Sequence, residues 1–491
     1  MKPLDIFFVR RFNDLDHIVP VVYRTAKEGR RTPLVLCLNP FMEITDDFRL
    51  KFLRESWGVK TQYVYTYYAP TLLQKVVGRW ICSSHIRSSV RDLFVARGGR
   101  ASGIRRGLKP FARPGEIALR IAYACFKKYL YAWTDRVPVR RFLFNKRWAE
   151  AFLKHTRAAT LVFDYVHSNI HVAGALIEAA RELGVPLISL PHGTSIFSGR
   201  PLEGPEDNHA RVIHSGVDYF VVHHRRDEKV LVDYGFDAKR LKVLGSARYC
   251  REWEEVLHRI VPTEKIPEPR DPERRLKVVY MERGADRHGA YKRLVWETLE
   301  RIASLDFVDF IIKPPTRTDR LHFGKLPDSV MVANDINSVN LCRWADVVVG
   351  TVTSILLEAF WQRRILLYPK YFHDDSMWFE ETGACWTVAG PEELEAALRR
   401  LKDDPLYRPY PQSAVDSFIR GVVYAEDADK DVLGRYCRFI AEAAGDGKDE
   451  NTVRREEYLV PRESREREQG ESFPPAPSSF AGSSLQHSRR K

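Results

Sequence analysis

The sequence lacks the cysteine pattern that would organise a small secreted fold or a zinc-bound fold. Its seven cysteines are an odd number, and no two of them are spaced as Cys-x-x-Cys. Neither a disulfide framework nor a cysteine-ligated zinc site is therefore indicated. We expect the cysteines to be buried small hydrophobic residues; they are Cys37, Cys82, Cys125, Cys250, Cys342, Cys385 and Cys437.

Long apolar runs are also missing. No uninterrupted run approaches the roughly 18 residues that a bilayer-spanning helix needs. The first residues, MKPLDIFFVRRF, carry Asp5, Arg10 and Arg11 too early for a secretory signal peptide. We therefore expect a cytoplasmic protein.

Acidic residues are scarce in one segment, residues 75–147. This segment holds 18 Lys or Arg residues against three acids, while the net charge of the whole chain is +13, so the remainder is close to neutral. Aromatic and aliphatic residues interleave with the cations, as in RIAYACFKKYLYAW. The pattern fits a segment lying on an anionic membrane surface, or a solvated helical face with a packed underside. We expect the protein to lie at the inner face of the cell membrane; no nucleic-acid reader motif is present, so we expect no nucleic acid as partner.

The order of apolar runs predicts an α/β fold. At 491 residues the chain is too long for one ordinary core. Short apolar runs alternate with helical periodicity, which is typical of parallel sheets. In the first half we expect strands at 5–10, 33–39, 61–68, 160–166, 186–190, 219–223 and 241–245.

A polar, proline-rich stretch at 261–275 interrupts this alternation, which then restarts. We therefore expect two Rossmann-like domains facing a cleft. The N-terminal domain would span 1–260 with the basic insertion at about 75–147, and the C-terminal domain would span 261–445. Residues 446–491 are polar and rich in Ser and Pro, and predict a disordered tail.

Two stretches of the first half could carry chemistry. His192 and Gly193 directly follow the expected strand 186–190, and ligands of open α/β sheets bind beyond the carboxyl ends of the strands. A histidine there can act as a general base near neutral pH, and the glycine allows close approach of a ligand. The other stretch follows the first expected strand and carries Arg10, Arg11, Asp16 and His17. Asp16 has a second interpretation, as the cap of a helix beginning at His17.

In the second half, several strand ends carry groups suited to a phosphorylated ligand. A lysine together with a guanidinium can hold a diphosphate without a metal ion. Thr and Ser after a strand can open a helix whose first N–H groups favour an anion, or can simply cap it. We expect no metal, since no acidic pair stands at a strand end. The candidate residues are Glu282, Arg283, Lys313, Arg317, Thr351, Thr353, Ser354 and Glu358.

Five ordered blocks resemble the GT-B glycosyltransferase superfamily, and most of all its branch of CDP-glycerol glycerophosphotransferases and capsular polysaccharide transferases. The blocks are LPHG, the stretch from YFVVHHRRDEKVLVDYG to LKVLGSARY, VVYMERG, FIIKPPTR and DINSVNLCRWADVVVGTVTSILLEAF. They cover about residues 160–370. The basic segment and the tail lie outside the resemblance.

The resemblance implies an acceptor-binding first half and a nucleotide-donor second half. His192 matches the histidine of the family's HG loop, a candidate base, and Arg248 matches the arginine of its G-x-P-R segment, although Ala247 replaces the proline. Lys313 matches the lysine of the K-x-H-P block, but Pro315 stands in place of the histidine. That departure favours a sugar donor over CDP-glycerol.

Thr353 and Ser354 match the family's serine pair, and Glu358 falls where sugar-transferring members place a ribose-binding glutamate. Gly193 adds to the expected donor contacts, and the first loop, with Arg10, Asp16 and His17, would shape the acceptor pocket. The resemblance thus implies a metal-independent glycosyltransferase that uses a nucleotide-sugar as co-substrate, needs no cofactor, and acts on a surface polysaccharide or lipid-linked glycan. The alternatives are a nucleotide-sugar 2-epimerase, a CDP-alcohol phosphotransferase and a non-catalytic binder of anionic glycans.

Overall fold

The computed structural model describes residues 2–40, 42–82, 142–164, 171–194, 196–199, 216–233, 235–266, 275–282, 292–315 and 330–446. Most of the basic segment, residues 83–141, and nearly all of the expected tail lie outside this described part. Both large sheets belong to one unit of the chain, Met1–Ala444. The boundary expected near residue 261 stays a prediction.

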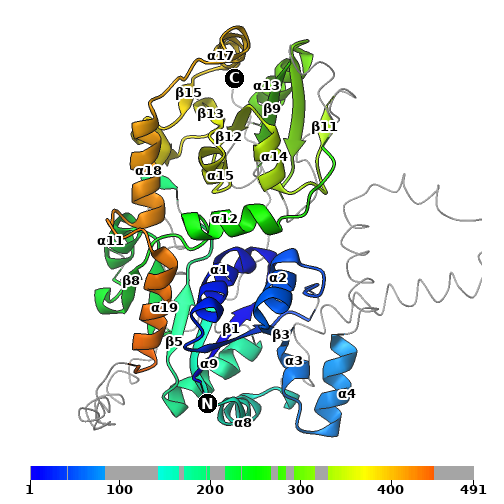
Figure 1. The fold of residues 1–491 in the computed structure, drawn as a ribbon, viewed down its shortest axis with the longest axis vertical. Coiled ribbons are helices and arrows are strands. Elements are labelled where there is room, and N and C mark those ends of the chain that lie inside the picture. Colours follow the sequence, from blue (N-terminus) through cyan, green and yellow to red (C-terminus); the bar gives the residue numbers. More distant parts are fainter. Residues whose placement is uncertain are drawn as a thin grey trace, which may run out of the picture. The chain divides into compact units, whose positions relative to one another are not determined.

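The first sheet is parallel throughout and has the strand order β3-β2-β1-β4-β5-β7-β8 (Figure 1). Its side chains are mostly apolar and buried, as expected for strands covered on both faces. The strands are β1 (Leu4–Val9), β2 (Thr32–Cys37), β3 (Lys60–Tyr63), β4 (Ala158–Asp164), β5 (Leu187–Leu190), β7 (Tyr219–Val222) and β8 (Leu241–Val243).

Helices connect these strands and cover the sheet. Glycines in the left-handed conformation end two of them, Gly29 after α1 and Gly58 after α2. The helices of this half are α1 (Phe12–Glu28), α2 (Phe48–Trp57), α3 (Val64–Tyr67), α4 (Leu72–Ile81), α8 (Lys146–Thr156), α9 (His171–Leu183), α11 (Arg225–Asp233), η2 (Ala238–Arg240) and α12 (Arg251–Ile260).

The second sheet is also parallel, with the order β11-β10-β9-β12-β13-β15. Its strands are β9 (Leu276–Met281), β10 (Val308–Lys313), β11 (Met331–Val332), β12 (Val347–Gly350), β13 (Ile365–Pro369) and β15 (Trp386–Val388). The helices of this half are α13 (Lys292–Ser304), α14 (Ser338–Trp344), α15 (Leu356–Trp361), η4 (Lys370–Phe372), α16 (Trp378–Glu381) and α17 (Pro391–Asp403), followed by α18 (Gln412–Tyr424) and α19 (Val432–Ala443).

Strand pairing and helix packing both help to connect the halves of the chain. The short strands β6 (Phe197–Gly199) and β14 (Ser376–Met377) form an antiparallel pair. The last helix, α19, packs against α1, and its Tyr436 hydroxyl donates to the carbonyl of Gly245 at 2.9 Å. Gly245 has φ 85°, and a Cβ there would lie 2.4 Å from the carbonyl oxygen of Val423, so the close approach of α18 requires glycine.

The predicted fold class is confirmed, because both sheets are parallel and built from alternating strands and helices. Two local expectations were wrong. The strand expected at 61–68 ends at Tyr63, and Val64–Tyr67 form a helical turn in which the buried Tyr65 hydroxyl donates to the carbonyl of Leu38 at 3.1 Å. Asp16 caps no helix, because α1 begins at Phe12 and Asp16 lies inside it.

Candidate active site

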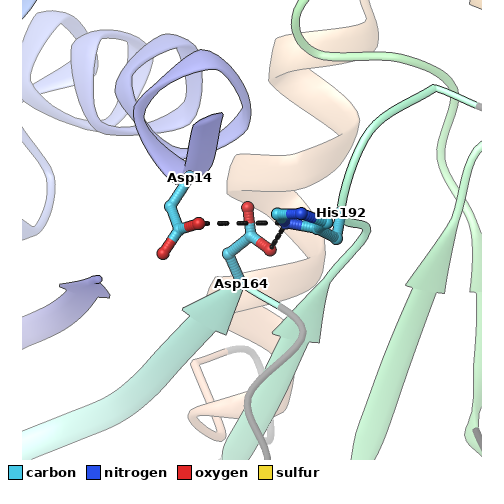
Figure 2. Close-up of side chains that lie close together, drawn as sticks. All are labelled: Asp14, Asp164 and His192. Atoms are coloured by element: carbon cyan, nitrogen blue, oxygen red, sulfur yellow. Dashed lines mark hydrogen bonds and ion pairs between the residues drawn. The ribbon is translucent and has the colours of Figure 1, made fainter. Parts of the chain in front are cut away.

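The site is organised around His192, just beyond the carboxyl end of β5. Asp164 ends the neighbouring strand β4, and the parallel pairing sets it opposite Leu190. Its Oδ1 lies 2.8 Å from His192 Nδ1 (Figure 2). An ionised carboxylate accepts hydrogen bonds and does not donate them, so with Asp164 ionised His192 Nδ1 is the donor of this pair.

A second carboxylate, Asp14, points toward the same imidazole. It lies in the first turn of α1, where its Oδ2 accepts hydrogen bonds from the backbone N–H groups of Arg10 at 2.7 Å and Arg11 at 3.1 Å. These bonds cap the helix and fix the side chain. Its other oxygen, Oδ1, lies 3.8 Å from His192 Nδ1 (Figure 2). Because β1 and β4 are adjacent in the sheet, the loop after β1 brings Asp14 to the end of β4.

Burial changes the acidity of both carboxyl groups. It raises the pKa of Asp164 to about 6, with the nearby Asp14 adding to the rise and the His192 hydrogen bond opposing it. Burial also raises the pKa of Asp14, against the lowering effect of Arg10. Within the described part of the chain, Asp14 Oδ1 and Asp164 Oδ2 have no hydrogen-bond partner. Buried polar atoms without partners are uncommon and occur at ligand and catalytic sites.

The loop after His192 is held by His17, one of the predicted acceptor residues. The backbone N–H of Gly193, at φ 85°, donates to His17 Nε2 at 3.0 Å. His17 is buried, and burial together with the charge of Arg248 lowers its pKa well below the ordinary value. His17 is therefore a neutral hydrogen-bond acceptor that positions the HG loop.

The other predicted residues of the first half surround this centre. Arg10 Nη2 donates to the Asp164 carbonyl at 3.3 Å, and Arg10 Nε lies 3.8 Å from Asp14 Oδ2. Asp16 forms ion pairs with Arg248, at 3.1 Å, and with Arg49. Arg248, expected on the donor side, and Asp16, expected on the acceptor side, are thus direct partners.

The predicted lysine of the second half is directed at backbone carbonyls. Lys313 is buried at the end of β10, and its Nζ donates to Ala333 O at 3.0 Å and Asn334 O at 2.8 Å. Glu282 is buried at the end of the neighbouring strand β9, and its N–H donates to the Lys313 carbonyl. The two strand ends therefore lie side by side, while Arg283 and Arg317 lie outside the described residues.

The Thr-Ser stretch does not open a helix as expected. Thr351, Thr353 and Ser354 lie in turns after β12, and α15 begins only at Leu356, after the uncapped Ile355. Their backbones make the turn themselves, since the carbonyl of Thr353 accepts from Leu356 N at 3.2 Å. With six residues, α15 is too short for a substantial dipole.

Glu358 lies in a second buried cluster. Its Oε1 is 2.7 Å from His258 Nε2 on α12 and accepts from Gln362 Nε2 at 2.7 Å. Glu254 Oε2 lies 3.3 Å from the same His258 nitrogen, and burial with the neighbouring Glu358 raises the pKa of Glu254 well above its ordinary range. The cluster connects α12 with the half of the chain that contains the second sheet. Its hydrogen bonds engage Oε1 of Glu358, the residue expected to bind a ribose.

Two groups of described residues have the donor atoms and spacing that a divalent cation needs. In each, the ligand atoms lie within 4.8 Å of one another; the groups are Asp14, Asp164 and His192, and Glu254, His258 and Glu358. Sequence reasoning missed Asp14 and Asp164 as site residues. The signal for Asp164 was an acid at the end of an apolar strand, TLVFD, one strand away from the HG loop.

Comparisons with known proteins place the fold. No family model matches the chain, and no curated protein matches its sequence. The MnaA–UDP co-structure of S. aureus is 12% identical, with a TM-score of 0.51 over 91% of this chain and 98% of that one. Together with the two parallel sheets, this similarity shows a GT-B-like fold.

Other solved structures are similar at lower scores. A UDP-GlcNAc 2-epimerase of Neisseria meningitidis, solved bound to UDP-GlcNAc, is 12% identical with a TM-score of 0.44, over 90% of this chain and 99% of that one. A glycosyltransferase of Rickettsia africae is 11% identical with a TM-score of 0.48, over 90% of this chain and 98% of that one. The structural neighbours thus include both glycosyltransferases and epimerases. No helix among the described residues is long and apolar enough to cross a membrane.

Proposed function

We propose that the protein is a metal-independent glycosyltransferase that moves a sugar from a nucleotide-sugar to a hydroxyl group of a surface polysaccharide or lipid-linked glycan. The observation that carries the proposal is the hydrogen bond from His192 Nδ1 to Asp164 at adjacent strand ends. A carboxylate behind the imidazole fixes its tautomer and stabilises the imidazolium that forms when Nε2 accepts a proton.

In the proposed reaction, His192 Nε2 removes the proton of the acceptor hydroxyl. The acceptor oxygen forms a bond to the anomeric carbon of the sugar, while the bond from that carbon to the diphosphate oxygen breaks. The nucleoside diphosphate leaves with the electron pair. Asp164 then faces a charged imidazolium, which the anionic carboxylate stabilises at hydrogen-bond distance.

The donor would be held by the loops of the second half together with Gly193 and Arg248. The proposed contacts are Glu282, Arg283, Lys313, Arg317, Thr351, Thr353, Ser354 and Glu358. Lys313 would attract a diphosphate through its positive charge, while its Nζ also donates to two backbone carbonyls. The acceptor would lie on the side of Arg10, Asp16 and His17.

Calorimetric or thermal-shift binding tests the donor proposal directly. The panel is UDP, CDP, GDP, CMP and their sugar conjugates, without added metal, and UDP comes first because it is the ligand of the S. aureus co-structure. A ligand that binds the native state raises the melting temperature by mass action. One clear hit supports the proposal, and CDP with CDP-glycerol would favour the phosphotransferase branch. If no nucleotide binds, a non-catalytic glycan binder is favoured.

His192→Ala tests the base. The variant should lose turnover by about 10²- to 10⁴-fold and keep its nucleotide affinity. His155→Ala provides a control, since His155 lies at the end of α8 that precedes β4, with its ring tilted against Tyr68 at a centroid distance of 4.9 Å, whereas Asp164 ends β4. Full activity of His192→Ala would remove the base assignment.

A nucleotide-sugar 2-epimerase is the second candidate, and Asp14 is the observation that favours it. Epimerisation needs acid and base groups at the sugar, and Asp14 places a second carboxyl group of raised pKa beside Asp164. An epimerase converts the nucleotide-sugar alone. Incubation without any acceptor, followed by separation of the nucleotide-sugars, distinguishes the two: a new epimer favours the epimerase, and an unchanged donor favours the transferase.

A further inference from the structure

Helix α4 presents its apolar side chains to solvent. Nine large hydrophobic residues are exposed in the described part of the chain, and four of them lie on this one helix: Leu72, Leu73, Val76 and Trp80. At 100° per residue, positions 72, 73, 76 and 80 share an arc of roughly 100°. A single exposed leucine needs no explanation, but a contiguous stripe marks an interaction surface.

The inner face of the same helix holds Gln74 and Gly78 beside the buried Ile81. Gly78 packs on the backbone of Tyr65 so closely that a Cβ would lie 2.4 Å from the carbonyl oxygen. The Gln74 amide donates to the Leu143 carbonyl at 2.7 Å, and Gln74 also forms a capping box with Thr71. The close glycine contact and the buried amide fix the rotation of the helix. The outward position of its apolar stripe is therefore built into the packing.

A further exposed apolar side chain, Phe142, lies one residue away from a contact of α4. Phe142 is 73% exposed, and its chain neighbour Leu143 is the residue whose carbonyl Gln74 holds. Figure 1 shows α4 beside α3, with which it packs. Leu72, Leu73, Val76 and Trp80 form what we call the α4 face.

Positive charge borders the α4 face. Lys75 and Arg79 are exposed on one side of the stripe, at helical angles next to Leu72. Residues 75–82 and 142–147 belong to the segment 75–147, which holds 18 basic and three acidic residues. Apolar side chains flanked by Lys and Arg, with a tryptophan among them, match the headgroup boundary of an anionic bilayer, which accepts both kinds of group at once.

We propose that the α4 face is a docking surface for an anionic lipid bilayer. Its four apolar side chains would enter the headgroup region, while Lys75 and Arg79 would contact anionic lipid. The docking surface consists of residues of α4 alone. Its use in bringing the enzyme to a membrane-bound acceptor rests on the proposed function. Lipid binding and nucleotide binding are separate measurements, so either proposal can fail without the other.

Co-sedimentation of the full chain with vesicles tests the docking surface. Vesicles of phosphatidylcholine alone are compared with vesicles containing about one-third phosphatidylglycerol, at low and at raised salt. We expect binding to the anionic vesicles that weakens as salt rises. Absence of binding to them at low salt overturns the proposal.

Substitutions locate the surface. Leu72→Ser combined with Val76→Ser should weaken vesicle binding about tenfold or more. Each substitution removes the favourable free energy of moving an apolar side chain from water into the bilayer boundary. Leu406→Ser combined with Val230→Ser is the matched control, since both residues are exposed elsewhere in the structure. Equal binding by the two double variants overturns the assignment. Unchanged melting temperatures show that neither variant has unfolded.

Discussion

Asp164 Oδ1 and His192 Nδ1 lie 2.8 Å apart, although the two residues are separated by 28 positions in the sequence. The contact exists because β4 and β5 are neighbours in a parallel sheet and end at the same edge. It orients the imidazole, and in the proposed reaction Nε2 would accept the substrate proton.

Replacing Asp164 by Asn tests whether turnover depends on the negative charge beside His192. The amide keeps the size of the side chain but loses the charge that stabilises the imidazolium, so turnover should fall by about 10²- to 10⁴-fold. Nucleotide affinity should change little. Steady-state kinetics and calorimetry measure the two quantities, with the exposed Asp416→Asn as control. Wild-type turnover in Asp164→Asn would show that the pair is not catalytic.

The raised pKa of Asp164 predicts the acid limb of the pH profile. With a pKa of about 6, this carboxyl group is protonated below that pH and no longer stabilises the imidazolium. The rate kcat/KM should therefore rise with pH through about 6 in the wild type. A profile that is flat from about pH 5 to 8 would contradict the assignment.

The same shift makes a prediction about stability. The pKa of Asp164 is higher in the folded than in the unfolded state, so folding favours its protonated form. Its contribution to stability is fully present below the unfolded pKa near 3.8 and is lost as pH rises through about 6. The side chain of Asp164→Asn stays neutral at every pH. As pH rises from about 3.8 to 6, the free energy of unfolding of the variant should therefore increase relative to that of the wild type. Urea unfolding at a series of pH values measures the difference, and a parallel pair of curves would refute it.

Metal independence is a prediction that chelators can test. The proposed transfer uses His192 and the strand-end groups, so turnover should be unchanged after treatment with EDTA. The experiment is needed because two groups of three residues, one around His192 and one around His258, could hold a metal ion. Activity that is lost with the chelator and restored by a divalent cation would assign one of them a catalytic metal; Glu254→Gln and Asp164→Asn would then show which.

Removing one partner of the buried ion pair on β1 should lower the free energy of unfolding strongly. Asp5 on β1 accepts from Arg31 Nε and Nη2, both at 2.6 Å, and from the Thr160 hydroxyl at 2.6 Å. Asp5→Ala removes the carboxylate that pairs with the buried guanidinium and should destabilise the fold by about 3–5 kcal/mol. Glu255→Ala, which breaks an exposed pair with Arg251, should cost about 1 kcal/mol or less. Denaturant unfolding compares them, and similar losses would argue against the buried pair.

The fold class could be predicted from the sequence because it depends on local pattern. Apolar runs such as LVLC and VVVG are buried strands. The pattern failed at 64–67, where Val and Tyr residues favour a strand but Tyr65 is buried by making a turn that packs against Phe144.

The site could be predicted only in part. His192 and Gly193 stand out after a strand, and the loop holding His17 was singled out. The partners of Glu358 were not foreseeable, because His258 belongs to a helix 100 positions earlier. Nor could the sequence show that Lys313 is directed at two carbonyls, since the direction of a side chain depends on its neighbours in the folded chain.

By itself, the sequence determined the alternation of strands and helices, the concentration of positive charge in one segment and the position of a histidine after a strand. Only the tertiary structure decided that Asp14 and Asp164, 150 residues apart, face one imidazole, and that α4 exposes its apolar stripe. The first set depends on the order of residues along the chain. The second depends on which strands become neighbours and on how a helix is rotated, and many distant packing contacts determine both.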